Sequence, residues 1–158
     1  MTSWMSWLGL AGWLALCFGV AWIGSLAMPP DGGWYAGLAK PAWTPPGWLF
    51  APVWTALYAM MAVSAWLVGR DRGFRHAPLA LTLFLAQLAL NGLWTWLFFG
   101  LHRPGLACAE IALLWIAIGL TLLRFWTVRP LAGALLAPYL VWVSFAGALN
   151  AMIWRLNS

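Results

Sequence analysis

Five long apolar runs, each long enough to cross a bilayer as a helix, constrain this chain more than any other feature. Prolines and scattered charges separate the runs, which cover about residues 4–28, 46–68, 78–101, 105–126 and 131–154. A helix rises about 1.5 Å per residue, so about 20 residues span a hydrocarbon core of about 30 Å. Backbone groups in lipid are paired only in helices or closed barrels. The pattern predicts an all-α, multi-pass integral membrane protein, with residues 1–158 forming one five-helix bundle.

The charge content supports a membrane environment and argues against a nucleic-acid partner. Only 7% of the 158 residues are charged, against about 25% in soluble domains. The net charge is +5, but the arginines stand singly at the ends of the apolar runs and form no basic stripe. An N-terminus on the cytoplasmic side would place five arginines inside and three basic residues outside, which favours that orientation. The five are Arg70, Arg72, Arg75, Arg124 and Arg129, and the three are Lys40, Arg103 and Arg155.

Connector length and small residues predict how the helices pack. Three of the four connectors are short, so sequential helices are expected to be antiparallel neighbours. Small residues at fourfold spacing permit close approach of helices in membranes, either within one chain or in a homodimer. These residues are Ala11, Ala15 and Gly19 on the first run, Thr82 and Ala86 on the third, and Gly105 and Ala109 on the fourth.

The first connector is the exception, because it is long, aromatic and rich in proline. Asp31 is placed to cap a short helix that begins near Gly33. Pro41, Pro45 and Pro46 stiffen the segment that follows. The aromatic residues are typical of a belt at the membrane interface. The alternative is a structured lid over a cavity between helix ends, with its apolar side chains facing inward.

Three runs carry aromatic and amide side chains on one helical face. The spacing groups Trp54 with Tyr58; Asn91 with Trp94 and Phe98; and Trp142 with Phe145, Ala146 and Leu149. Such stripes usually serve packing, but Asn91 and Asn150 lie deep in apolar runs, where an unpaired amide is costly. Polar groups there typically join helices or line a pathway. Glu110 and Arg124 lie nearer the ends of the fourth run and are expected to reach the interface by snorkelling.

Catalytic and metal-binding patterns do not emerge from the sequence. His76 and His102 fall in connectors, so neither is expected to reach a pocket from a helix. The chain has no recognisable catalytic triad, paired carboxylates, metal-ligand spacing or phosphate-binding glycine loop. We therefore expect no metal site and no required cofactor.

Three motifs in order give the chain a family resemblance. The stretch "WYAGLAKPAWTPP" from Trp34, "NGLWTWLFFG" from Asn91 and "PYLVWVSFAGALN" from Pro138 resemble the TspO/MBR family of tryptophan-rich sensory proteins. This family includes relatives of the mitochondrial translocator protein, the peripheral-type benzodiazepine receptor. The resemblance extends from about residue 29 to residue 155, and the first helix matches only in character.

The resemblance implies a five-helix bundle whose first connector covers a ligand cavity. It implies porphyrins such as protoporphyrin IX and haem as ligands, which the protein would sense, sequester or move. Carried over by motif, the ligand-binding residues are Tyr35, Pro45, Trp54, Tyr58, Asn91, Trp94, Trp142, Ala146 and Leu149. The animal cholesterol motif is broken here, since Ala151 and Met152 replace its aromatic residues, which argues against cholesterol as a partner.

Three other functions remain open at this level. Some members of the resembled family degrade bound porphyrin in light, and Trp54 and Trp142 would then be the oxidisable, catalytic residues. A secondary transporter of small apolar ligands would need two access states, but the chain lacks inverted repeats and titratable groups in mid-membrane. A structural membrane scaffold would bind no tetrapyrrole.

Overall fold

The computed structural model describes the backbone of residues 3–158 and the side chains from Ser6 onward; Met1 and Thr2 of the expected domain lie outside the described residues. Within that range the chain is helical and has no strand. Five helices are long and apolar enough to cross a membrane, which confirms the predicted fold class. They are α1 (Ser3–Ser25), α3 (Phe50–Asp71), α5 (Pro78–Thr95), α6 (Pro104–Val128) and α7 (Pro130–Leu156).

Proline fixes where three of these helices begin. Pro78, Pro104 and Pro130 occupy the first turns of α5, α6 and α7, where a missing N–H breaks no helical hydrogen bond. The first helix ends at Ser25, three residues before the expected end near residue 28. The chain then forms the first connector (residues 26–46), which contains the short helix α2 (Gly33–Ala36) and leads into a 3-10 turn (Gly47–Leu49) before α3.

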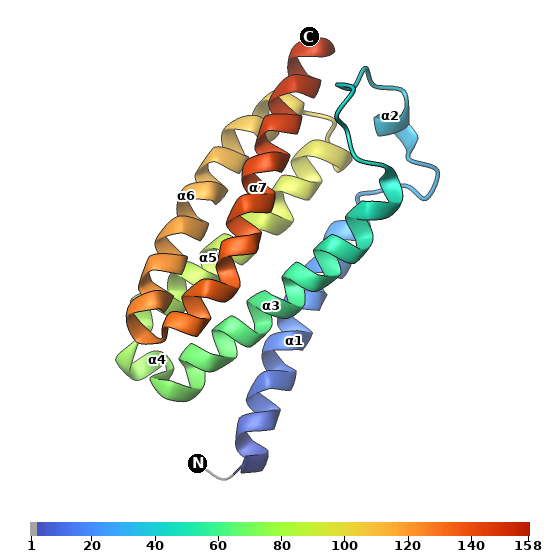
Figure 1. Ribbon diagram of the computed structural model, residues 1–158. Helices are drawn as coiled ribbons and strands as arrows, with labels where there is room; N and C mark the ends of the chain where they lie inside the picture. The colour runs from blue at the N-terminus through green and yellow to red at the C-terminus, as the bar shows by residue number, and fades with distance from the viewer. Residues whose placement is uncertain (1–2) are drawn as a thin grey trace.

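The long helices form a closed ring in the order α1, α3, α7, α6, α5. The two ends of the chain lie at opposite ends of the bundle, and the first connector lies at the C-terminal end (Figure 1). The expectation that all sequential helices are close neighbours is wrong for one pair. The short turn containing α4 (Gly73–His76) joins α3 to α5, yet these two helices make only marginal contact. A cavity lies between them near the first connector, so few of their residues touch there.

The end of α5 widens into a π-helical turn over Trp96–Gly100. Its signature is the bond from the Leu101 N–H to the Trp96 carbonyl, at 2.7 Å. Such turns insert one residue into the helical repeat and are frequent at functional sites. Here the turn positions Phe98 and Phe99, and both side chains line the cavity.

Glu110 corrects one prediction. It was expected at the membrane interface, but only 8% of its surface is exposed, and neither carboxylate oxygen has a hydrogen-bond partner among the described residues. The reason is helical spacing, because Glu110 follows Ala107 by three residues and precedes Leu114 by four, and both of these are buried on the inner face of α6. Arg124 is exposed at the far end of the same helix, as expected.

Most of the small residues at fourfold spacing face away from the bundle. Ala11, Ala15, Thr82, Ala86 and Ala109 are exposed. In the fourth run, Gly105 does serve packing within the chain, since a Cβ there would lie 3.0 Å from the Trp154 ring. A homodimer through the exposed small residues stays a prediction.

Candidate functional site

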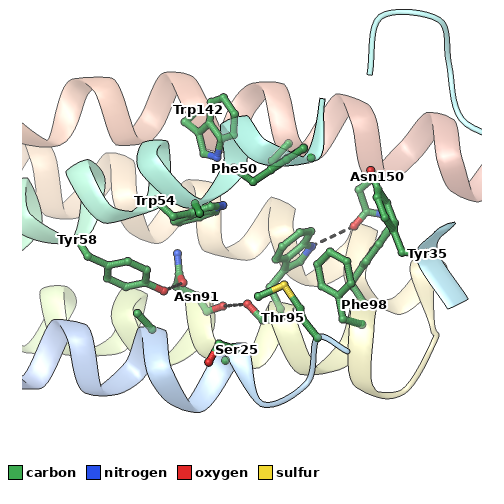
Figure 2. Close-up of a pocket in the computed structure, with 18 of the residues that line it drawn as sticks. Ser25, Tyr35, Phe50, Trp54, Tyr58, Asn91, Thr95, Phe98, Trp142 and Asn150 are labelled. Atoms are coloured by element: carbon green, nitrogen blue, oxygen red, sulfur yellow. Dashed lines mark hydrogen bonds between the residues drawn. The ribbon is translucent and has the colours of Figure 1, made fainter. Parts of the chain in front are cut away.

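A cavity of about 450 Å³ opens between α1, α3, α5 and α7 beneath the first connector. Figure 2 shows its walls: Trp54, Phe50 and Trp142 on one side, and Asn91, Thr95 and Phe98 on the other. The lining is mainly apolar, and its polar groups are hydroxyls and amides. Ligand pockets in proteins typically enclose about 300–1,000 Å³ and combine apolar walls with a few polar groups, so this cavity has the size and character of a small-molecule site.

Asn91 joins three helices at the inner end of the cavity. Its amide oxygen accepts a hydrogen bond of 2.5 Å from the Tyr58 hydroxyl on α3, and its amide nitrogen donates one of 2.8 Å to the Tyr139 hydroxyl on α7. Asn91 is 2% exposed and Tyr139 is fully buried. A buried polar group is stabilising only when it is paired, and this network pairs all three side chains.

Asn150 makes a second bridge nearer the connector. Its amide oxygen accepts a 3.0 Å hydrogen bond from Trp94 Nε1 on α5, and its nitrogen donates a 2.8 Å bond to the Pro104 carbonyl at the start of α6. The bridge fixes the orientation of the Trp94 ring, which stacks on Phe98 at 5.4 Å between centroids. The two asparagines therefore hold the aromatic wall in one geometry.

The aromatic rings of α3 and α7 form the opposite wall. Trp54 packs against Tyr58 at 5.7 Å and against Tyr139 at 6.3 Å between ring centroids. Trp142 meets Phe50 edge to face at 5.9 Å. Offset and edge-to-face pairs are the preferred arrangements of aromatic rings. The rings that border the cavity are thus held in place by contacts with other aromatic rings.

Tyr35 brings the first connector to the cavity, and Lys40 packs against it. Tyr35 lines the cavity and contacts Phe98 and Phe99 at 6.1 and 5.5 Å between centroids. The Lys40 ammonium lies 4.7 Å from the centre of the Tyr35 ring and donates hydrogen bonds to the carbonyls of Tyr35, Ala36 and Leu38. Partial burial raises the pKa of Tyr35 above its ordinary value, so its hydroxyl stays protonated at neutral pH.

The turn that starts the connector depends on Asp31 and Gly33. The Asp31 carboxylate accepts a 3.1 Å hydrogen bond from the Gly33 N–H, and α2 begins at Gly33 as predicted. Gly33 has a φ of +43°, and a Cβ there would lie 2.4 Å from Pro29 Cγ. Only glycine fits this position, both for its backbone and for its space.

Three contacts attach the connector to the ends of the long helices. Asn157, just beyond α7, accepts a hydrogen bond from the Ala39 N–H at 3.0 Å and donates one to the Ala39 carbonyl at 2.9 Å. Trp34 stacks on His102 at 4.6 Å, and Trp43 meets Phe145 edge to face at 5.7 Å. All of these contacts lie near the surface of the molecule.

Eight of the nine ligand-binding residues predicted from the sequence line this cavity. These are Tyr35, Trp54, Tyr58, Asn91, Trp94, Trp142, Ala146 and Leu149. Pro45 lies in the connector and is not among the lining residues. Their binding role remains a prediction. Within the connector, Tyr35 lines the cavity and Trp43 is 47% exposed; that the connector acts as a lid stays a prediction.

Sequence reasoning missed the wall that α1 contributes. Phe18, Ala21, Gly24 and Ser25 of α1, with Met28 just beyond it, line the cavity from this side. Their spacing follows one helical face, and this signal was present in the sequence. The small residues singled out on the first run, Ala11, Ala15 and Gly19, do not line the cavity.

The chemistry of the cavity is that of binding by stacking and apolar contact. Among the residues that the structure describes, no charged side chain and no histidine lines it. His102 lies at the neighbouring connector and its ring is covered by Trp34. The side chains at the cavity can therefore hold a flat, apolar molecule, orient it through hydroxyl and amide groups, and exchange electrons through indole and phenol rings.

Comparison with known proteins places these features in a family. Residues 13–155 match the model of the TspO/MBR family. The chain is 45% identical to protein CrtK of Rhodobacter capsulatus over 127 residues, which cover 80% of this chain and 79% of the relative. It is 44% identical to tryptophan-rich protein TspO of Chlorobaculum tepidum over 152 residues (95% and 96%). It is 42% identical to human translocator protein over 126 residues (78% and 75%). The chain belongs to the TspO/MBR family.

Proposed function

We propose that this TspO/MBR protein is a membrane receptor for tetrapyrroles such as protoporphyrin IX and haem, which it holds in the cavity beneath the first connector. The supporting observation is the cavity itself: apolar, bordered by supported aromatic rings, and without a charged lining group. A flat macrocycle gains stacking and apolar contact from such walls. Its propionate groups would point toward the first connector, where Lys40 places a positive charge beside Tyr35.

The mode of binding follows from the cavity's side chains. With no histidine in the lining, iron gains no axial imidazole ligand there. Metal-free protoporphyrin IX is therefore expected to bind at least as tightly as haem. Titration of the purified protein with both, followed by quenching of tryptophan fluorescence, tests this expectation. Binding that requires iron would contradict a site based on ring stacking.

We also propose that the first connector acts as a lid. It supplies Tyr35 to the cavity, and the residues of α2 and of the 3-10 turn before α3 are at most half-buried. Segments with little buried surface open at low free energy. A ligand would enter and leave past this connector, while the asparagine-linked helices keep their places.

A second candidate function is light-driven oxidation of the bound porphyrin with dioxygen as the oxidant. Trp54 and Trp142 both line the cavity, and Trp54 contacts Tyr58 and Tyr139. An excited porphyrin would accept an electron from an indole and pass it to dioxygen, which becomes superoxide. The oxidised indole would then regain an electron from the porphyrin, and the resulting porphyrin radical cation would combine with superoxide, so that dioxygen oxidises the macrocycle and the indole is restored. A covered cavity that excludes water would hold the reacting groups together.

Illumination of matched variants separates this reaction from simple bleaching. Trp54→Phe and Trp142→Phe keep an aromatic surface but replace the readily oxidised indole. Loss of a defined product at equal porphyrin occupancy would support a reaction through these residues. Identical products and rates in the wild type and both variants would exclude it.

Transport and a purely structural role predict other outcomes. A transporter would move labelled protoporphyrin into proteoliposomes faster than it enters protein-free liposomes, whereas a receptor would only retain it. A scaffold would fold and bind no tetrapyrrole at all. The same purified protein serves both measurements.

A further inference from the structure

Arginine gathers at the end of the bundle opposite the first connector. Five arginines lie where α3 and α6 end, in the turn that contains α4, and just before α7, and one aspartate, Asp71, accompanies them. They are Arg70, Arg72, Arg75, Arg124 and Arg129. Basic residues at one face of a membrane protein meet the anionic leaflet of the bilayer. This end therefore carries more basic residues than the cavity end, where Lys40, Arg103 and Arg155 lie.

A groove of about 190 Å³ lies at this end between α1 and α3. Two glycines open it. A Cβ at Gly69 would lie 3.3 Å from Trp13 Nε1, and a Cβ at Gly9 would lie 3.6 Å from Trp66 Cδ1. Larger side chains at these positions would fill the space between the two helices. Phe74, which is 51% exposed, extends the groove with an apolar surface.

Arg70 is held in the groove with its terminal nitrogens free. Its guanidinium lies 4.8 Å from the centre of the Trp66 ring, and Nε donates to Asp71 at 3.4 Å. Neither Nη atom donates a hydrogen bond within the described residues. Asp71 is shared, because Arg129 Nη1 also donates to it at 3.1 Å. One carboxylate thus faces two guanidinium groups, and a positive charge remains.

Trp13 offers a second donor in the same groove. Its Nε1 finds no acceptor among the described residues, although Trp66 Nε1 beside it donates to the Ser6 carbonyl at 2.8 Å. Arg70 and Trp13 therefore line one small space, and the Arg70 Nη atoms and the Trp13 indole N–H have no acceptor among residues 6–158. Arg70 is exposed, with 36% of its side-chain surface accessible, and Trp13 is half-buried, so both donors can reach a ligand that enters the groove from the membrane surface.

We propose that this groove binds the phosphate group of an anionic phospholipid. Arg70 would donate two hydrogen bonds to phosphate oxygens, since the planar guanidinium matches phosphate geometry, and Trp13 would donate a third. The acyl chains would lie along the exposed apolar surface of α1 and on Phe74. The site depends on charge complementarity at the bundle end and is separate from the cavity that holds the proposed tetrapyrrole.

Native mass spectrometry of the delipidated protein tests the proposal. Phosphatidylglycerol and phosphatidylcholine are added in equal amounts, and the retained lipids are counted for the wild type, Arg70→Gln and Arg75→Gln. Arg75 is exposed at the same end but does not line the groove, so its variant is matched in charge. We expect the wild type to prefer phosphatidylglycerol, Arg70→Gln to bind it about tenfold more weakly, and Arg75→Gln to behave as the wild type.

A second variant, Gly9→Leu, tests the groove without changing any charge. It remains informative even if Arg70→Gln does not fold. Gly9→Leu fills the groove and leaves every arginine in place, so it should lose phosphatidylglycerol to a similar extent. Equal binding of the two lipids by the wild type would overturn the proposal, as would equal losses in Arg70→Gln and Arg75→Gln. Displacement of the lipid by millimolar inorganic phosphate would also overturn it, because the groove would then be a site for free anions.

Discussion

The helical wall of the cavity and the connector above it are built on opposite principles. Asn91 and Asn150 are 2% and 1% exposed, and each joins elements that are far apart in the sequence. The connector contains Asn157's partner Ala39, which is exposed, and the residues of its helix α2 are at most half-buried. Both regions use an asparagine amide as a bridge. The two regions differ in burial, because Asn91 and Asn150 are buried and Asn157 is exposed.

This difference explains how one small bundle can keep the wall of its cavity rigid and still let the cavity open. Buried hydrogen bonds are costly to break because the separated groups find no water in the membrane interior. Hydrogen bonds at the surface exchange with water and contribute less. The wall should therefore govern whether the protein folds, and the connector should govern how readily the cavity opens.

The largest effect is expected in the wall. Asn91→Leu keeps the volume of the side chain but leaves the hydroxyls of Tyr58 and Tyr139 without their shared partner. The free energy of unfolding should fall by about 2 kcal/mol, seen as a lower midpoint in thermal unfolding of the detergent-solubilised protein. Thr82→Leu, on an exposed face of α5, is the control and should unfold as the wild type does. Equal midpoints for Asn91→Leu and the control would mean that the hydrogen bonds in the wall do not govern the stability of the fold.

An intermediate effect is expected at the start of the connector. Gly33→Ala places a Cβ 2.4 Å from Pro29 Cγ at a φ of +43°, a strain of about 1–3 kcal/mol. Amide hydrogen exchange in residues 33–40 should become about tenfold faster, while exchange in α5 and α7 stays unchanged. Gly119→Ala on α6, where a Cβ meets no atom within 4 Å, provides the control. Faster exchange throughout the bundle would mean that the connector does not open separately.

The smallest effect is expected at the attachment to the C-terminal end of α7. Asn157→Ala removes both bonds to Ala39, and surface hydrogen bonds of this kind contribute about 0.5–1 kcal/mol. Exchange in the connector should rise about threefold, with no change in the thermal midpoint. Ser158→Ala, at a neighbouring residue that does not contact the connector, should have no effect. A fall in the midpoint as large as that of Asn91→Leu would show that the two asparagines are equivalent.

Sequence patterns predicted the helices well because bilayer thickness and backbone pairing leave few alternatives. The faces of α3, α5 and α7 could also be predicted, since Trp54, Asn91 and Trp142 stand on helical spacings. The contribution of α1 was missed, as was the marginal contact between α3 and α5. Both depend on how the five helices close into a ring, and connector lengths alone do not determine that order.

Glu110 shows a second limit of sequence reasoning. Its distance from the end of the fourth run suggested that the side chain reaches the interface, but the buried stripe of α6 turns it inward. Position along a helix and direction around it are separate quantities, and the second depends on which neighbours the helix meets. The π-helical turn at Trp96–Gly100 was not predicted either, because no residue pattern in "NGLWTWLFFG" indicates it.

The central claim is that a tetrapyrrole occupies the cavity between the wall and the connector. The most direct test is equilibrium titration of metal-free protoporphyrin IX into the wild type and into Ala146→Phe and Ala21→Phe, which fill the cavity from α7 and from α1. Ala109→Phe, on an exposed face of α6, adds the same side chain elsewhere. The account predicts saturable one-to-one binding by the wild type and by Ala109→Phe, and its loss in whichever cavity-filling variants remain folded and monodisperse. Undiminished binding by a folded cavity-filling variant would contradict the account.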